Sequence, residues 1–206
     1  NDVLLPHKYI EDNTEIGDEI EVFIYRDSED RLIATNLVPE VYLNQFALLE
    51  VVATSKFGAF LNWGLEKDLF VPFKEQNHKL REGQWVPVFL YLDTKTDRLV
   101  ASAKVNKYFK NVGDNPTVDD LEVGQLVDIF VFEKTDLGLN VAINNLYKGL
   151  IYENEIFKRL AWGDKAKAYI KSIREDGKID VSLQPLGFKN TIEPNCEAIL
   201  NKLKNS

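Results

Sequence analysis

The sequence has very few of the residues that bind metals or form disulfides. It contains one cysteine, Cys196, and two histidines, His7 and His78, among 206 residues. One cysteine cannot form an intrachain disulfide, and this set cannot supply the ligands of a zinc finger or zinc ribbon. The sequence therefore excludes a disulfide-stabilised fold and multi-cysteine redox motifs. It favours a reduced, cytoplasmic setting and a protein without a metal.

Signals for membranes, cofactors and catalysis are also missing. No apolar run is long enough to form a membrane span, and the N-terminus lacks the charged-then-apolar order of a signal peptide. The sequence has no dinucleotide-binding glycine motif and no P-loop, and no nucleophile, base and orienting group can be assembled from it. We therefore expect a protein that does not act at a membrane, uses no cofactor and is not an enzyme.

Positive charge is scarce over the chain as a whole. The 25 lysines and arginines are outnumbered by 33 acidic residues, so the net charge is -8. This is the wrong sign for a protein that wraps duplex DNA by neutralising phosphates along its whole surface. With 45% hydrophobic residues, however, the chain has enough apolar surface to bury real cores.

The sequence does contain an internal repeat. Three segments share a glycine, a run of alternating apolar and polar residues, a polar turn and a short strand that ends in a small residue. They are residues 17–35, 83–102 and 163–182. Their turns contain the Asp, Ser and Gly residues that tight hairpins need, so each segment predicts a β-hairpin.

A second pattern precedes two of these hairpins, in residues 47–73 and 126–152. In each, a strand runs into a glycine and is followed by another strand and an apolar triplet. Gly58 lies 25 residues before Gly83, and Gly138 lies 25 residues before Gly163, so the two units have the same register. Five short strands closed by a hairpin predict a small barrel of the OB-fold type.

The predicted fold is therefore all-β, with tandem OB-fold barrels over residues 44–105 and 118–186. The first hairpin is preceded only by residues 3–6 (VLLP), so residues 1–38 predict the back half of a third barrel. Its open sheet edge leads us to expect that the natural chain continues before Asn1. Residues 190–206 predict an amphipathic helix, with Pro194 in its first turn, that starts a further domain.

The middle unit resembles the RNA-binding domain named after ribosomal protein S-one. That domain has FGAFV, then GLVHVS, then a closing D…R(I/L)xLS, and this sequence has FGAFL at 57–61 and Asp93 followed by RLVAS at 98–102. The third unit resembles the domain less closely. Residues 68–73 (DLFVPF) and 96–104 (TDRLVASAK) also resemble the bacterial conserved virulence factor B family (CvfB, YitL-like). In that family a winged-helix domain follows the S-one units.

The resemblance implies an RNA-binding site on the middle unit. Phe57 and Phe60 would form a stacking platform, while Lys56 and Arg98 would contact phosphates. We expect Gly58 to tolerate a bulge that turns both rings to one side of the strand. The alternative is that both rings are buried, since phenylalanines on strands usually belong to the core.

The third unit lacks this platform, because Leu137 and Asn140 replace the two phenylalanines. Its candidate RNA contacts are Tyr147, Lys148, Tyr152 and Lys178. We expect this unit to bind more weakly than the middle one.

Two functional hypotheses from different classes follow. The first is a non-catalytic regulator of gene expression that holds single-stranded RNA; the resemblance implies a link to virulence. The second is a module that docks a ribosomal, transcriptional or RNA-decay protein.

The charge differs between the segments of the chain. Basic and acidic residues number 3 and 11 in residues 1–43, 10 and 7 in 44–112, and 12 and 15 in 113–206. Only the segment with Phe57, Phe60 and Arg98 is positive, which favours localised, salt-sensitive RNA binding there.

Overall fold

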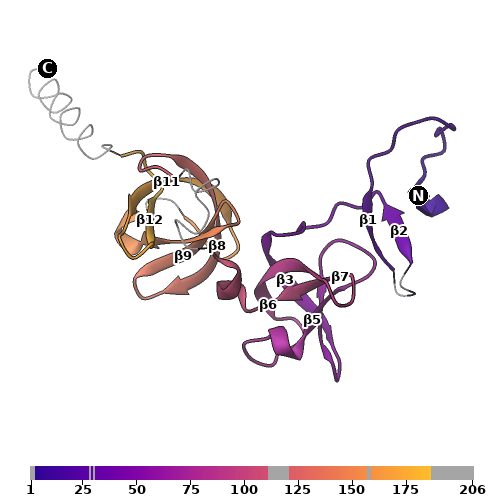
Figure 1. Cartoon of the computed structure of the whole chain (residues 1–206), viewed down its shortest axis with the longest axis horizontal. Helices are drawn as coiled ribbons and strands as arrows, with labels where there is room; N and C mark the ends of the chain where they lie inside the picture. The colour runs from indigo at the N-terminus through magenta and orange to yellow at the C-terminus, as the bar shows by residue number, and fades with distance from the viewer. Residues whose placement is uncertain (1–2, 28, 30, 111–120, 157–158, 187–206) are drawn as a thin grey trace, which may run out of the picture. The chain divides into compact units, whose positions relative to one another are not determined.

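The computed structural model describes residues 3–27, 29, 31–110, 121–156 and 159–186 (Figure 1). These residues form strands and short 3-10 helices, so the all-β prediction is confirmed. The chain divides into two compact units, Asn1–Lys107 and Tyr108–Ser206. The predicted helix at 190–206, and the further domain that it would start, lie outside the described residues.

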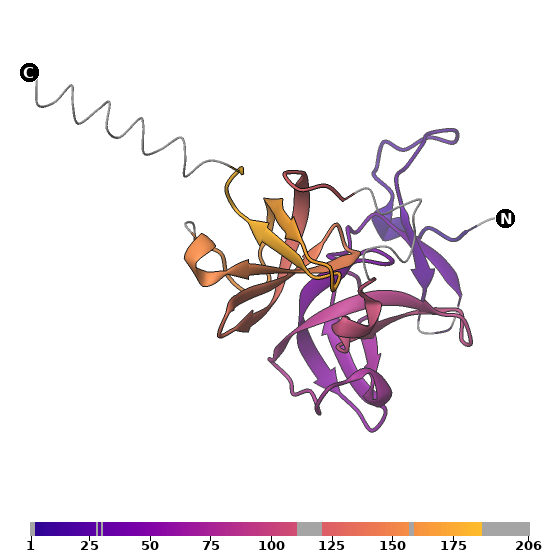
Figure 2. The ribbon, with the colours of Figure 1, turned by 60° about the vertical axis from the view of Figure 1, so that its left-hand side comes forward.

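The second unit contains a closed five-stranded barrel. Figure 1 shows its strands as a ring, and Figure 2 shows the same barrel from another side. The strands are β8 (Leu126–Thr135), β9 (Gly138–Ile143), β10 (Tyr147–Tyr152), β11 (Lys165–Ile173) and β12 (Ile179–Ser182). They pair in the order β10-β12-β11-β8-β9, and the parallel pairing of β10 with β12 closes the ring. The helix η4 (Glu153–Glu155) follows β10. The second unit thus contains the closed barrel that the repeat predicts, with its strands between Leu126 and Ser182.

Alternation along the strands builds the core of this barrel. Val127, Ile129 and Val131 of β8 are buried, whereas Leu126 and Asp128 between and beside them are exposed. Since successive side chains of a strand point to opposite faces, this pattern turns one row of aliphatic groups inward. The inward rows of all five strands form one apolar cluster.

The first unit contains a five-stranded sheet of the same design. Its strands are β3 (Phe46–Thr54), β4 (Gly58–Asn62), β5 (Leu69–Pro72), β6 (Trp85–Asp93) and β7 (Arg98–Ser102), in the order β5-β4-β3-β6-β7. The helix η2 (Phe73–Glu75) follows β5, and η3 (Val105–Tyr108) follows β7. The order matches that of the closed barrel, but no strand pairing joins β5 to β7 among the described residues. The barrel predicted for this unit is therefore a sheet that strand pairing does not close, and it is called the middle barrel below.

The N-terminal segment has the back half of the same design. Leu4 makes a parallel bridge to Ile33, and η1 (His7–Tyr9) and the hairpin β1 (Phe23–Arg26) and β2 (Leu32–Thr35) follow. In the second barrel, Leu150 of β10 pairs in parallel with Asp180 of β12 in the same way. The bridge from Leu4 to Ile33 is therefore equivalent to the pairing of β10 with β12 in the second barrel.

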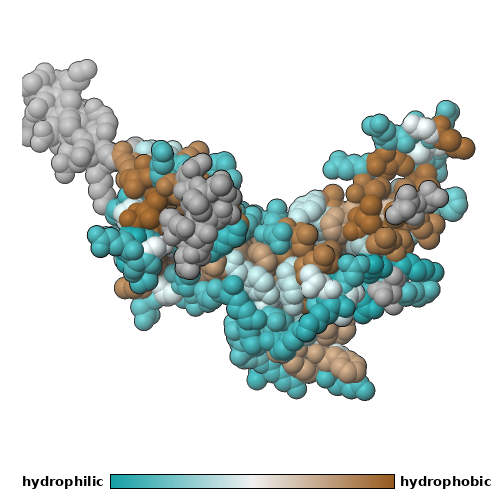
Figure 3. Space-filling model, in the orientation of Figure 1, coloured by the Kyte–Doolittle hydropathy of each residue, from teal (hydrophilic) through white to brown (hydrophobic). Residues whose placement is uncertain are grey.

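This hairpin packs on the middle barrel. Tyr25 is buried in the same apolar cluster as Leu49 and Leu61 of the barrel, and Phe23 and Ile33 pack against that cluster. On the opposite face of the hairpin two apolar side chains are exposed, Ile24 at 49% and Leu32 at 50% of their full exposure. Figure 3 shows apolar surface over this hairpin. The segment and the middle barrel thus share one core.

No helix among the described residues is long and apolar enough to cross a membrane.

Candidate nucleic-acid interface

A cavity of about 670 Å³ lies in the first unit, where β4, β5 and β7 of the barrel approach β1 of the hairpin. Its wall is mainly aromatic and aliphatic, from Tyr25, Phe57, Phe60, Trp63, Leu69, Phe70, Leu99 and Val100. Four charged residues complete it, and they are Arg26, Lys67, Asp68 and Arg98. The volume falls in the range of pockets that hold small organic ligands.

The two phenylalanines of the predicted platform line this cavity together. Phe57 is 66% exposed and lies in the turn before β4, where its N–H donates to the Ser55 hydroxyl at 3.1 Å. Phe60 is half-buried on β4, and its ring lies 5.2 Å from the ring of Phe70. The structure thus leaves Phe57 exposed and packs Phe60 beside Phe70 on the neighbouring strand.

The predicted role of Gly58 was wrong. Phe57 lies in a turn before the strand, so no bulge at Gly58 is needed to turn the two rings to one side. The bulge is in the neighbouring strand β3, between Val51 and Ala53. A Cβ on Gly58 would lie 2.2 Å from the carbonyl oxygen of Val71, so Gly58 allows β5 to approach β4.

The two predicted cations differ in their relation to the cavity. Arg98 begins β7 opposite Asp93, is exposed and lines the cavity with the phenylalanines. The Lys56 ammonium lies 5.0 Å from the centre of the Phe57 ring, on a residue outside the cavity wall. Both cations thus lie close to a base that would stack on Phe57.

Sequence reasoning missed the contribution of the N-terminal hairpin. The Lys67 ammonium donates to the carbonyl oxygens of Arg26 and Asp27 at 2.9 and 2.6 Å. The Arg26 guanidinium forms an ion pair with Asp97 and donates to the carbonyl oxygen of Asp97 at 3.0 Å. These contacts hold Tyr25 and Arg26 at the wall of the cavity. No local signal could reveal them, because the partners are 40 or more residues apart.

The candidates in the third unit do not form a comparable site. Tyr147 is 1% exposed and lies in the barrel core, so its ring cannot stack on a base and that prediction was wrong. Lys148 is exposed, with its ammonium 5.5 Å from the centre of the Phe132 ring. Lys178 is exposed and forms an ion pair with Asp176 at 2.7 Å.

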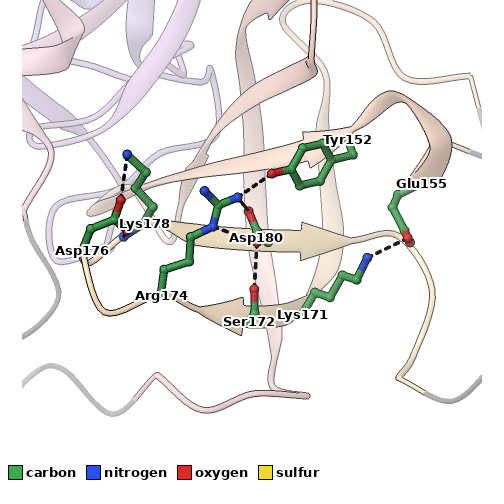
Figure 4. A network of polar contacts seen from close by, with 8 residues as sticks. All are labelled: Tyr152, Glu155, Lys171, Ser172, Arg174, Asp176, Lys178 and Asp180. Atoms are coloured by element: carbon green, nitrogen blue, oxygen red, sulfur yellow. Dashed lines mark hydrogen bonds and ion pairs between the residues drawn. The ribbon is translucent and has the colours of Figure 1, made fainter.

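Tyr152 belongs to a polar network on the barrel wall (Figure 4). Its hydroxyl accepts a hydrogen bond from Arg174, which also donates to Asp180 at 3.1 and 2.6 Å. The Ser172 hydroxyl donates to the same carboxylate at 2.8 Å. The hydrogen bonds and charge of Asp180 raise the pKa of Arg174 above its ordinary value. Tyr152 is therefore already engaged within its own barrel.

The comparisons with known proteins agree with the geometry of the first unit. A family model described as S1 domain, the S-one type domain considered above, matches residues 1–37 and 45–104. The match includes both the N-terminal hairpin and the middle barrel, which share one core.

Named relatives are bacterial. Conserved virulence factor B of Staphylococcus epidermidis is 26% identical over 187 residues, which is 87% of this chain and 61% of that protein. YitL of Bacillus subtilis is 24% identical over 213 residues, which is 98% of this chain and 68% of that protein. The chain thus spans about three fifths of the length of the virulence factor relatives.

A solved structure from Streptococcus pneumoniae, described as a multidomain protein with nucleic acid binding domains, is 22% identical. The match covers 90% of this chain and 66% of the chain in that structure, with a TM-score of 0.43. The S1 match and the named relatives together confirm the resemblance of this chain to the conserved virulence factor B and YitL family, with S1-type domains.

Proposed function

We propose that this chain binds single-stranded RNA, without catalysis, in the cavity of its first unit. The S1 match supports a general RNA-binding role. The observation that carries the proposal is the shared cavity, because Phe57, Phe60 and Arg98 were chosen from the sequence and line the same space. Arg26 and Lys67 add two more cations to its wall.

The chemistry of the cavity suits unpaired nucleotides. A base that stacks on an aromatic ring gains roughly 1 to 3 kcal/mol, and every base can do so because each has a flat face. In a duplex the base faces are already stacked, whereas single-stranded RNA can splay a base into a recess. The arginines beside the rings would contact the phosphates on either side.

We extend the proposal to the role of the protein in the cell. It would act in the cytoplasm in the control of gene expression after transcription, with a winged-helix domain after the S1-type units. The link to virulence is supported only by the names of the relatives.

Binding to a short fluorescent oligouridylate, followed by anisotropy, tests the proposal. Replacing Phe57 and Phe60 together by Ala should weaken binding about 10- to 100-fold, because two stacking surfaces are lost. Replacing Arg98 by Ala should also reduce the slope of log affinity against log salt concentration by about one, the amount expected for one phosphate contact. This slope is measured between roughly 50 and 200 mM salt.

Two residues outside the cavity wall supply control variants. Phe73 is an exposed aromatic residue and Lys79 an exposed cation, so Phe73→Ala and Lys79→Ala should bind nearly as well as the wild type. Equal affinity of the wild type and the Phe57/Phe60 double variant would overturn the proposal.

Docking of a protein partner is the second candidate. Two exposed apolar side chains of the N-terminal hairpin, Ile24 and Leu32, favour it. This hypothesis predicts that the wild type does not bind the oligonucleotide, a result that the RNA proposal forbids.

A further inference from the structure

We propose that Asp68 makes the cavity selective for guanine among the four RNA bases. This inference rests on the proposed function, since it assumes that a base enters the cavity. The stacking rings cannot select a base by themselves, because stacking tolerates every sequence. A polar group on the same wall is needed for selection, and Asp68 is the one acceptor-only side chain among the cavity-lining residues.

The backbone around Asp68 is held in place. The buried Trp63 donates from its indole nitrogen to the carbonyl oxygen of Lys67 at 2.6 Å. On the other side of Asp68, Leu69 begins β5 and is 2% exposed. Asp68 therefore presents its side chain from a fixed position, as a residue that selects a ligand must.

The carboxylate of Asp68 is available to a ligand. It has neither a hydrogen bond nor an ion pair with any other residue that the structure describes, although three cations line the same cavity. Two of those cations have partners elsewhere, Arg26 with Asp97 and Lys67 with carbonyl oxygens. Asp68 is exposed, but the protein around it removes part of its hydration, which raises the pKa of its carboxyl group.

A carboxylate in this position repels phosphate and attracts N–H donors. Ionised Asp only accepts hydrogen bonds, and it accepts best from two parallel donors. Among the unpaired bases, guanine has two neighbouring donors on its Watson–Crick edge, the N1–H and the N2 amino group. Uracil has one N–H between two carbonyl oxygens, while adenine and cytosine have one amino group beside an acceptor nitrogen. Guanine therefore suits Asp68 best.

The test compares short oligouridylates in which one central residue is guanosine, inosine, adenosine, cytidine or uridine. Anisotropy with the full chain should show that the guanosine strand binds about tenfold tighter than the uridine strand. Inosine lacks the N2 amino group, so its strand should have an intermediate affinity. This comparison changes the RNA alone and does not depend on the folding of a variant.

Protein variants then assign the preference to one side chain. Asp68→Asn should bring the guanosine and uridine strands within about twofold of each other, while uridine binding stays the same or improves because a negative charge is lost. Glu66→Gln removes the same charge two residues away, from a residue outside the cavity wall, and should keep the preference.

The two proposals can fail separately. Equal binding of the guanosine and uridine strands by the wild type, or a guanosine preference that persists in Asp68→Asn, would overturn the role of Asp68 and leave RNA binding intact. Absence of binding to every strand would overturn both.

Discussion

A buried carboxylate recurs at one position of both barrels. Glu75 follows β5 and accepts from the Ser102 hydroxyl at 2.6 Å and from Lys107 at 2.8 Å. In the second barrel Glu155 accepts from Ser182 at 2.9 Å and, as Figure 4 shows, pairs with Lys171. Each serine is the small residue that ends a repeated hairpin. The repeat thus preserves a polar contact that joins the strand end to the 3-10 helix.

This contact predicts a pH dependence of stability in the first unit. Burial alone would raise the pKa of Glu75, but hydrogen bonds from Lys107 and Ser102 hold it below its ordinary value of 4.5. A lowered pKa in the folded state contributes stability above pH 4.5 that is lost as the pH falls through the folded value. Glu75→Gln should therefore lower the free energy of unfolding at pH 7 by about 1 to 3 kcal/mol.

Urea denaturation at pH 7 and at pH 4 measures this effect. The difference in free energy of unfolding between the wild type and Glu75→Gln should be smaller at the lower pH. Glu40 is exposed, so Glu40→Gln should be as stable as the wild type at both pH values. A gap that is the same at pH 7 and pH 4 would show that the charge of Glu75 does not contribute.

At the scale of elements, a glycine begins the second strand of each barrel for steric reasons. A Cβ would lie 2.2 Å from the carbonyl oxygen of Val71 at Gly58, and 2.0 Å from that of Ile151 at Gly138. Both oxygens belong to the facing strand, so neither clash can be relieved by a side-chain rotation. The 25-residue spacing from these glycines to the next hairpin therefore marks the same close approach of two strands in each barrel.

We expect Gly58→Ala to destabilise the first unit by about 2 to 4 kcal/mol, because the backbone of β5 must move. Gly83→Ala is the matched control. Gly83 has a φ of 76° but open space around its Cβ, so only backbone strain of about 1 kcal/mol applies. Equal losses for the two variants, measured by urea denaturation, would contradict the steric explanation.

At the scale of the whole molecule, the chain has two separate apolar cores. Leu49 and the N-terminal Tyr25 belong to the first, and Ile170 belongs to the second. Units with their own cores can unfold separately. We expect calorimetry to show two unfolding transitions. Leu49→Ala should reduce the free energy of unfolding of the first unit alone, and Ile170→Ala that of the second unit alone, each by about 2 to 5 kcal/mol. A single transition that both variants lower equally would contradict this.

Net charge shows why composition alone could not locate the site. The first unit as a whole has 12 basic and 18 acidic residues, because the acidic N-terminal segment belongs to it. Its cavity nevertheless has three cations and one carboxylate on the wall. The local arrangement decides binding, since exposed charges more than about 10 Å apart are largely screened at ordinary salt.

The sequence by itself determined the elements and their order. The hairpins predicted at 17–35, 83–102 and 163–182 are present as β1-β2, β6-β7 and β11-β12. Alternation and turn chemistry act over a few residues, so they can be recognised without knowledge of the fold. The resemblance to the S-one domain also placed Phe57, Phe60 and Arg98 in one predicted site, and all three line the same cavity.

Only the tertiary structure decided which face each strand buries and which distant segments meet. Tyr147, predicted to contact RNA, is instead turned into the core by the register of β10. Arg26 and Asp68 reach the same cavity because the hairpin packs on the barrel, through contacts between residues about 40 positions apart. Such contacts depend on how whole elements fill a shared core, and no short stretch of sequence contains that information.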